Sequence, residues 1–183
     1  VLYPWLTGGI SYTFDRKYDD SVRAVRWNEF NANAGFRLPF NFSGGRFYKY
    51  LTLASSFNTQ QLYFREDSRP KPGNDAVNYI QSSVSFAIQS QQARQHIYPR
   101  YAFSFFAQQK FSVDDNAARQ LLLSGSVYLP GILKTHNLVL DGAYQQRDTM
   151  NRYRFSNSFP LSRGYPALDF DRMYKVGGNY HLP

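Results

Sequence analysis

The sequence predicts an all-β fold: a transmembrane antiparallel up-and-down β-barrel built from long strands. Apolar and polar residues alternate with period two along most of the chain, which is typical of strands with two unlike faces. The runs are about a dozen residues long, whereas soluble sheets average about 5 to 6 and a membrane strand needs roughly 9 to 11. The polar set is rich in Ser, Asn and Gln, which suits a wet lumen better than a sealed core.

Composition supports a single domain spanning residues 1–183 and narrows the partners. Aromatic residues make up 18% of the chain, and there is no Cys. No run approaches the roughly 18 to 20 consecutive apolar residues of a membrane helix, so helical spanning is excluded. The 21 Lys and Arg against 13 Asp and Glu give a net charge of +8, which suits nucleic acid, anionic lipid or an anionic substrate.

Eight strands are predicted in chain order. The first alternates over residues 6–14 and is followed by a polar turn at 15–21. The second, 27–40, is the clearest, with Phe, Ala and Leu on one face and Glu, Asn and Arg on the other. In the fifth, Phe106 facing inward and Gln109 facing outward break the pattern. The remaining alternating runs cover 48–63, 79–92, 101–111, 120–129, 138–145 and 175–182.

The connections fall into two classes, which alternate along the chain. Three are short or carry tight-turn residues, and three are mostly longer and more charged: 41–46, 92–99 and 130–135, against 15–22, 65–77 and 148–174. Alternate connections of a meander lie at the same end, so one rim is expected to be tight and the other decorated, as in outer-membrane barrels. The longest loop, 149–174, is expected to fold toward the lumen.

A soluble β-sandwich or lipocalin-like barrel is the alternative that the alternation leaves open. In that fold the apolar face would form the interior, and the polar face would contact bulk water. The two folds are distinguished by the burial of four apolar and three polar side chains, namely Phe30, Phe36, Leu53 and Phe86, and Asn31, Gln60 and Gln89.

The longest loop centres on Ser162-Arg163-Gly164-Tyr165. An arginine keeps its charge and presents five donors that match carboxylates, so Arg163 could pin the loop to the lumen wall. Gly164 allows a turn with positive φ, and Tyr165 can anchor the tip by packing and one hydrogen bond. A solvent-exposed surface arginine is the alternative. The candidate acidic partners of Arg163 are Glu29, Asp141, Asp169 and Asp171.

This loop and the Gly177-Gly178-Asn179 strand after it resemble the outer-membrane assembly and two-partner-secretion superfamily, the BamA, TamA and FhaC relatives. In that family a Val-Arg-Gly-Phe/Tyr motif lies on a loop that folds into the lumen, and a Gly-Gly-rich strand follows. Ser162 departs from the usual Val. The turn at 95–100 is also similar to one in such barrels from Bacteroidota.

The resemblance implies a sixteen-stranded barrel of which these eight strands look like the fifth to twelfth. It implies a bacterial outer-membrane protein, a surface antigen, that inserts or translocates client proteins by templating their strands on a weakly paired seam outside this sequence. Outer-membrane lipid, lipopolysaccharide, periplasmic POTRA-type domains and accessory lipoproteins are the implied partners. A passive porin or an outer-membrane anchor barrel is the alternative. A nucleic-acid partner is not expected, because the basic residues form no single stripe.

No enzymatic chemistry is predicted. The three histidines, His96, His136 and His181, lack metal-ligand spacing. No serine lies in a Gly-x-Ser-x-Gly elbow, and the Asp169 and Asp171 pair is more simply explained as solvated. Neither a metal nor a cofactor is expected.

Overall fold

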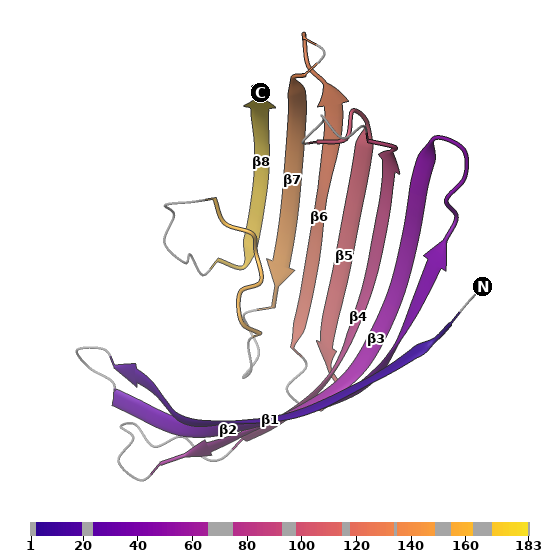
Figure 1. The fold of residues 1–183 in the computed structure, drawn as a ribbon. Coiled ribbons are helices and arrows are strands. Elements are labelled where there is room, and N and C mark those ends of the chain that lie inside the picture. Colours follow the sequence, from indigo (N-terminus) through magenta and orange to yellow (C-terminus); the bar gives the residue numbers. More distant parts are fainter. Residues whose placement is uncertain are drawn as a thin grey trace.

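Eight antiparallel strands follow one another in chain order in a single sheet (Figure 1). The computed structural model describes residues 3–19, 24–65, 75–92, 98–114, 118–133, 135–148, 155–162 and 170–182. The prediction of eight up-and-down strands is confirmed. The strands are β1 (Trp5–Asp19), β2 (Ala24–Asn41), β3 (Phe47–Phe64), β4 (Asp75–Ser90), β5 (Ala102–Ser112), β6 (Arg119–Pro130), β7 (Asn137–Arg147) and β8 (Arg172–His181).

The strands are longer than predicted at several ends. The polar turn expected at 15–21 is wrong for most of its length, because β1 continues to Asp19 and pairs with β2 as far as Ala24. The β1–β2 register shifts between Thr13 and Arg16, and Asp15, which lies in this bulge, has a positive φ of 48°. Its N–H donates to Asn28 Oδ1 at 3.0 Å. A bulge of this kind keeps the hairpin paired beyond a polar residue, so residues 15–19 of the predicted turn lie on β1, and residues 20–21 lie outside the described residues.

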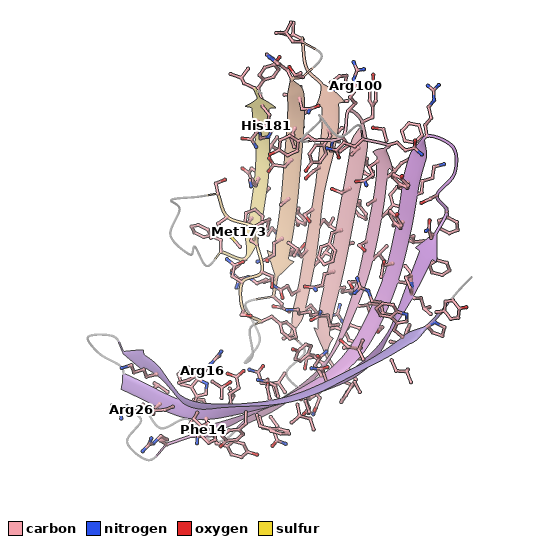
Figure 2. All side chains as sticks on the ribbon, viewed as in Figure 1. Phe14, Arg16, Arg26, Arg100, Met173 and His181 are labelled. Atoms are coloured by element: carbon pink, nitrogen blue, oxygen red, sulfur yellow. The ribbon has the colours of Figure 1, made fainter. Side chains whose placement is uncertain are left out.

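The sheet has one apolar face and one polar face, with the parity that the alternation predicts, including Phe106 and Gln109. Large apolar side chains are exposed on one face, for example Leu6, Ile10, Phe36, Phe57, Phe103, Leu140 and Val176. The other face carries Asn31, Asn58, Gln81, Ser83, Ser124 and Gln145. Figure 2 shows side chains standing off both faces, with Phe14 and Arg26 on the opposite side of the β1–β2 hairpin from Arg16.

The sheet is curved and open. In Figure 1 it bends so that β1 and β2 sweep beneath the ends of the later strands, and the segment 155–162 lies inside the curve. The face that carries this segment is called the inner face below, and the apolar face is called the outer face. Within the described residues β1 and β8 pair only with β2 and β7, so the sheet does not close on itself.

The apolar residues named as the test of a soluble core do not form one. Phe36 is 44% exposed, and Phe30, Leu53 and Phe86 are only partly covered. Of the three polar residues, Asn31 and Gln60 are half-buried on the inner face, whereas Gln89 is exposed there. The described residues therefore lack the two-layer apolar interior that a β-sandwich would need.

Apolar burial is concentrated on the inner face. Met173 and Phe155 are buried there, and a second aromatic group forms at the other end, where the Tyr98 ring lies 4.5 Å from that of His181 and 6.3 Å from that of Tyr128. The buried apolar residues among those described are Val77, Ala118, Leu122, Val139, Phe155 and Met173.

The expected contrast between one rim of tight connections and one rim of long connections is found only in part. The connection at 42–46 is tight, with Gly45 at φ 61°. The connection at 91–101 lies on the same rim but is long. The longest connection lies on the opposite rim, between β7 and β8, and ends where β8 begins at Arg172, earlier than predicted.

Candidate functional site

The segment 155–162 returns onto the inner face after β7 instead of extending away from the sheet (Figure 1). Its described backbone has no helix or strand, so its polar groups need partners from side chains, from its own turns or from water. Residues 149–154 and 163–169 lie outside the described residues, so the fold of the long loop as a whole toward the lumen stays a prediction. The contacts below define a docking site formed by β4, β5, β6 and β7.

Arg147, at the end of β7, donates from its side chain to two residues of the long connection, Phe155 and Phe170. Its Nη1 donates to the carbonyl of Phe155 at 3.3 Å, and its Nη2 donates to the carbonyl of Phe170 at 2.8 Å. Its backbone N–H donates to the carbonyl of Asp171 at 2.8 Å. The residue is 4% exposed. A buried guanidinium suits this role because its planar fork donates in several fixed directions at once, so a single residue closes the loop at its base.

Two glutamines of the inner face bind the backbone and one side chain of the segment. Gln145 is fully buried; its Nε2 donates to Asn157 Oδ1 at 2.9 Å, and its Oε1 accepts from the N–H of Ser158 at 3.1 Å. Gln120 Nε2 donates to the carbonyl of Ser156 at 3.1 Å. Asn157 Oδ1 also accepts from the N–H of Phe159 at 2.8 Å. Three polar groups of the segment therefore have amide partners on the wall, although most of its residues are half-buried or exposed.

Phe155 supplies the apolar part of the docking site. It is 4% exposed, and its ring meets that of Tyr79 edge to face with centroids 5.0 Å apart. Lys110 Nζ lies 5.9 Å from the ring centroid, within the range of a cation–π contact. Tyr79 belongs to β4 and Lys110 to β5. The Phe155 ring therefore connects the segment after β7 with two strands that lie far from it in sequence.

Glu29, one of the predicted partners of Arg163, belongs to a polar network on the inner face of β1, β2 and β3. It accepts hydrogen bonds from Arg16 at 2.8 Å, Asn31 at 2.8 Å and Gln60 at 3.0 Å. Glu29 itself is buried, while the Arg16 side chain is half exposed. This carboxylate already has a cation and two amide donors.

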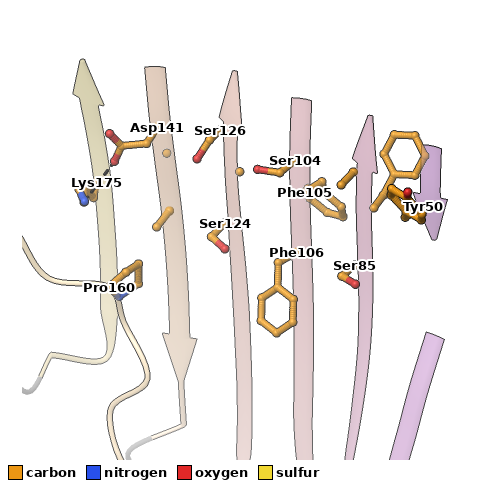
Figure 3. Close-up of a pocket in the computed structure, with 15 residues that line it drawn as sticks. Tyr50, Ser85, Ser104, Phe105, Phe106, Ser124, Ser126, Asp141, Pro160 and Lys175 are labelled. Carbon is orange, nitrogen blue, oxygen red and sulfur yellow. Dashed lines mark ion pairs between the residues drawn. The ribbon is translucent and has the colours of Figure 1, made fainter. Parts of the chain in front are cut away.

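Asp141, a second predicted partner, forms an ion pair with Lys175 on the neighbouring strand at 3.1 Å (Figure 3). Gly177 lies opposite Asp141, and a Cβ there would come within 2.7 Å of the carboxylate. The Gly-Gly-Asn run lies in the second half of β8 and does not open the strand as predicted. Its first glycine leaves room for the ion pair. Gly178 and Asn179 lie opposite Leu140 and Val139.

A hollow of about 460 Å³ lies beside this ion pair on the inner face (Figure 3). Pro160 of the docked segment borders it, and Phe106 projects into it from β5. Its floor consists of small residues on adjacent strands, which leave the space open: Ser85, Ala87, Ser104, Ser124, Ser126 and Ala143. Serine hydroxyls and the ion pair line part of this hollow, and aromatic rings, among them that of Phe106, line another part.

The centre of the predicted motif lies largely outside the described residues. Ser162 is exposed at the end of the docked segment, whereas Arg163, Gly164, Tyr165 and Asp169 are not among those described. Asp171 contributes its backbone carbonyl to Arg147. The pairing of Arg163 with a carboxylate therefore remains a prediction.

The histidines take part in aromatic and hydrogen-bond contacts. His136 Nδ1 lies 2.9 Å from the hydroxyl of Tyr180, and His181 stacks near Tyr98. His96 lies outside the described residues. No group of three His, Asp or Glu side chains with metal-binding geometry occurs in the described ranges. The same part of the chain contains no helix of the length and apolarity required to cross a membrane.

Sequence reasoning did not single out Arg147, Gln120 or Phe155 as loop contacts. The predicted seventh strand ended at residue 145, and its extension to Arg147 continues the alternation by one more inward position. Continuing the alternation would have placed Arg147 on the inner face, directly before the longest loop, and this was the available sign that it contacts the loop. Comparison of the chain with protein-family models, with curated proteins and with solved structures finds no match.

The arrangement provides a curved wall, a hydrophilic inner surface and a segment held against that surface by buried donors. It can position a peptide segment inside the curve and leave a polar space beside it.

Proposed function

We propose that this chain forms part of the wall of a bacterial outer-membrane β-barrel that inserts proteins into that membrane or translocates them across it. The outer face would contact lipid, because large apolar side chains are exposed on it along every strand except β6. The inner face would line the lumen. Further strands, bonded to the open edges of β1 and β8, would complete a barrel, with sixteen strands as the expected number.

The observation that supports this proposal most is the docking of residues 155–162 on the inner face by Arg147, Gln145 and Gln120. A loop braced in this way narrows the lumen and stiffens the wall next to it. The sequence resemblance to assembly and secretion barrels assigns such a bracing role to the loop that carries the Arg-Gly-Tyr motif. Client proteins, outer-membrane lipid and lipopolysaccharide, and periplasmic POTRA-type domains with accessory lipoproteins are the partners that this function would require.

Arg163→Ala in the full-length protein tests the proposal in cells. We expect loss of client insertion or secretion while the protein still reaches the outer membrane, because the motif arginine would brace the loop from its tip. Client export and heat-modified gel migration of the barrel measure activity and stability. Unchanged activity together with unchanged barrel stability would contradict the proposal.

A passive porin or anchor barrel is the second candidate, and the hollow of about 460 Å³ beside Pro160 favours it. Serine hydroxyls and the Asp141–Lys175 pair would keep that space hydrated. Single-channel conductance in planar bilayers separates the two functions. A large, steady conductance that is the same in the wild type and Arg163→Ala would identify a pore with a fixed constriction.

A further inference from the structure

The hollow of about 460 Å³ has a polar part in which hydroxyl groups and one ion pair lie on adjacent strands. Ser104, Ser126 and Asp141 lie directly opposite one another on β5, β6 and β7. Ser124 is the next inner-face residue of β6, and Lys175 contacts Asp141 from β8. Figure 3 shows these side chains beside the hollow. The polar part is therefore a row of hydrogen-bonding groups that extends from β5 to β8.

These polar groups keep capacity for further hydrogen bonds. The hydroxyl groups of the three serines take part in none of the hydrogen bonds among the described residues. The ion pair joins Lys175 Nζ to Asp141 Oδ2 at 3.1 Å, which leaves Oδ1 and the other ammonium protons for a ligand. The two side chains are 26% and 24% exposed, so a ligand can reach them.

Phe106 supplies an apolar part of the hollow. It lies opposite Ser85 and Ser124, which are small, so its half-buried ring stands among short side chains (Figure 3). Two strand spacings and two residues separate Phe106 from Asp141, which corresponds to about 12 Å along the wall. The hollow thus has an aromatic ring at one end and a carboxylate at the other.

We infer that the hollow binds a neutral saccharide of disaccharide length, with one sugar ring against Phe106 and hydroxyl groups of the other bonded to Asp141 and Lys175. A sugar ring presents C–H groups on its faces, which the electron-rich face of an aromatic ring attracts. Its hydroxyl groups both donate and accept, so they can bond the carboxylate and the ammonium group together. The volume lies within the roughly 300 to 1,000 Å³ of small-molecule sites.

The charges of the hollow and its position narrow the choice of ligand. Asp141 and Lys175 are the only charged residues that line it, all its lining residues are described, and the two charges neutralise each other. A neutral ligand leaves this pair intact, whereas an anion would compete with Asp141 for Lys175. The sheet separates the inner face from the outer face, so the ligand is a dissolved saccharide and not a lipid head group. The inference goes beyond the proposed function, because neither insertion nor translocation of proteins requires a saccharide.

Gly177 keeps the carboxylate accessible and provides a sharp test. It lies opposite Asp141, and an added Cβ would lie 2.7 Å from Oδ1, the oxygen that the ion pair leaves for a ligand. Gly177→Ala therefore covers or displaces this oxygen. Gly178→Ala is the matched control, because Gly178 is the next residue of β8, faces outward, and its added Cβ would meet Leu140 Cδ2 at 3.4 Å.

The experiment uses the full-length protein in micelles of lauryldimethylamine oxide, a detergent without sugar groups. Isothermal titration calorimetry measures the binding of maltose, lactose and chitobiose, and glycylphenylalanine serves as a ligand of another class. Phe106→Leu is the second variant, with Phe103→Leu as its control on the outer face of the same strand. Heat-modified gel migration verifies that each variant is folded.

At least one of the three disaccharides is expected to bind the wild type. Gly177→Ala should weaken its binding by at least about tenfold, because a hydrogen bond to a charged group is lost. Phe106→Leu should weaken it about threefold to tenfold, because the aromatic face is lost. Gly178→Ala and Phe103→Leu should bind like the wild type.

Absence of binding by all three disaccharides would refute the inference. Equal affinities of Gly177→Ala and Gly178→Ala would also refute it, as would equal affinities of Phe106→Leu and Phe103→Leu, and the second comparison decides if Gly177→Ala does not fold. Tighter binding of glycylphenylalanine than of every disaccharide would identify a peptide site and overturn the assignment to a saccharide. None of these titrations depends on protein insertion or export, so the proposed function stands or falls separately.

Discussion

Replacing Arg147 with Ala tests whether one residue of the wall closes the base of the long connection. Arg147 is buried and donates from its side chain to the carbonyl groups of Phe155 and Phe170, which lie near the two ends of that connection. Alanine removes the donors and leaves both carbonyl groups to find water at a covered site. The effect should be local, because the backbone pairing of β7 with β6 and β8 does not depend on the side chain.

The magnitude follows from the two contacts. A hydrogen bond that involves a charged group contributes about 1.5 to 3 kcal/mol, and the 3.3 Å contact to Phe155 is the weaker of the two. Removing both is expected to cost about 3 kcal/mol of docking free energy, or a factor of roughly 150 in the opening equilibrium. Hydrogen exchange at the amides of Ser158 and Phe159 measures this opening. Ser158 donates to Gln145 of β7, and Phe159 donates to Asn157 Oδ1, which itself accepts a hydrogen bond from Gln145.

Arg119→Ala is the matched control. Arg119 is an exposed arginine on neighbouring β6, at the same rim and with outer-face parity. Its removal should leave exchange at Ser158 and Phe159 unchanged. Arg147→Lys should fall between the wild type and Arg147→Ala, because an ammonium cannot reproduce the two directions of the guanidinium. If the two amides exchange at the wild-type rate in Arg147→Ala, then the closing role assigned to Arg147 is wrong.

Two further predictions concern the sheet itself and are measured by denaturant unfolding in detergent micelles. Gly35→Ala should destabilise the β2–β3 hairpin by about 1 to 3 kcal/mol, because a Cβ would lie 2.5 Å from the carbonyl oxygen of Ser55; Gly44→Ala, where no atom lies within 4 Å, should change stability by less than about 0.5 kcal/mol. A similar unfolding midpoint for the two variants would show that the strands separate to accept the methyl group. Glu29→Gln should cost about 2 kcal/mol, since one of its three acceptor contacts must face an amide donor. Asp15→Asn, which alters an exposed ion pair, should cost less than about 1 kcal/mol of unfolding free energy. A larger loss of stability for Asp15→Asn than for Glu29→Gln would contradict this ranking of the two contacts.

Most of the strand pattern could be predicted because it depends on local chemistry. Side-chain direction alternates with every residue of a strand, so the order of apolar and polar residues in β2 or β4 already defines which face each occupies. The inward position of Phe106 was predictable for the same reason, although its size departs from that of its small neighbours. The end of β1 was not predictable from charge, since a bulge at Asp15 lets polar residues remain paired.

The candidate site was predictable only in outline. A long aromatic loop before a Gly-Gly strand indicated docking, and residues 155–162 do lie on the inner face. Arg147, Gln145 and Gln120 come from two adjacent strands, and their convergence on one segment depends on how the connection folds back. Nothing in the spacing of these residues distinguishes them from other inward-facing polar residues.

The sequence by itself determined the strands, their parity and the chemical contrast between the two faces, because each of these follows from side chains within a few residues of one another. Only the tertiary structure decided where residues 155–162 of the long connection lie, that Arg147 donates to two residues of this connection, that Glu29 and Asp141 have cations of their own, and that the sheet is an open curve. These features depend on the register and curvature of all eight strands together, and contacts between residues far apart in the chain are set at that level.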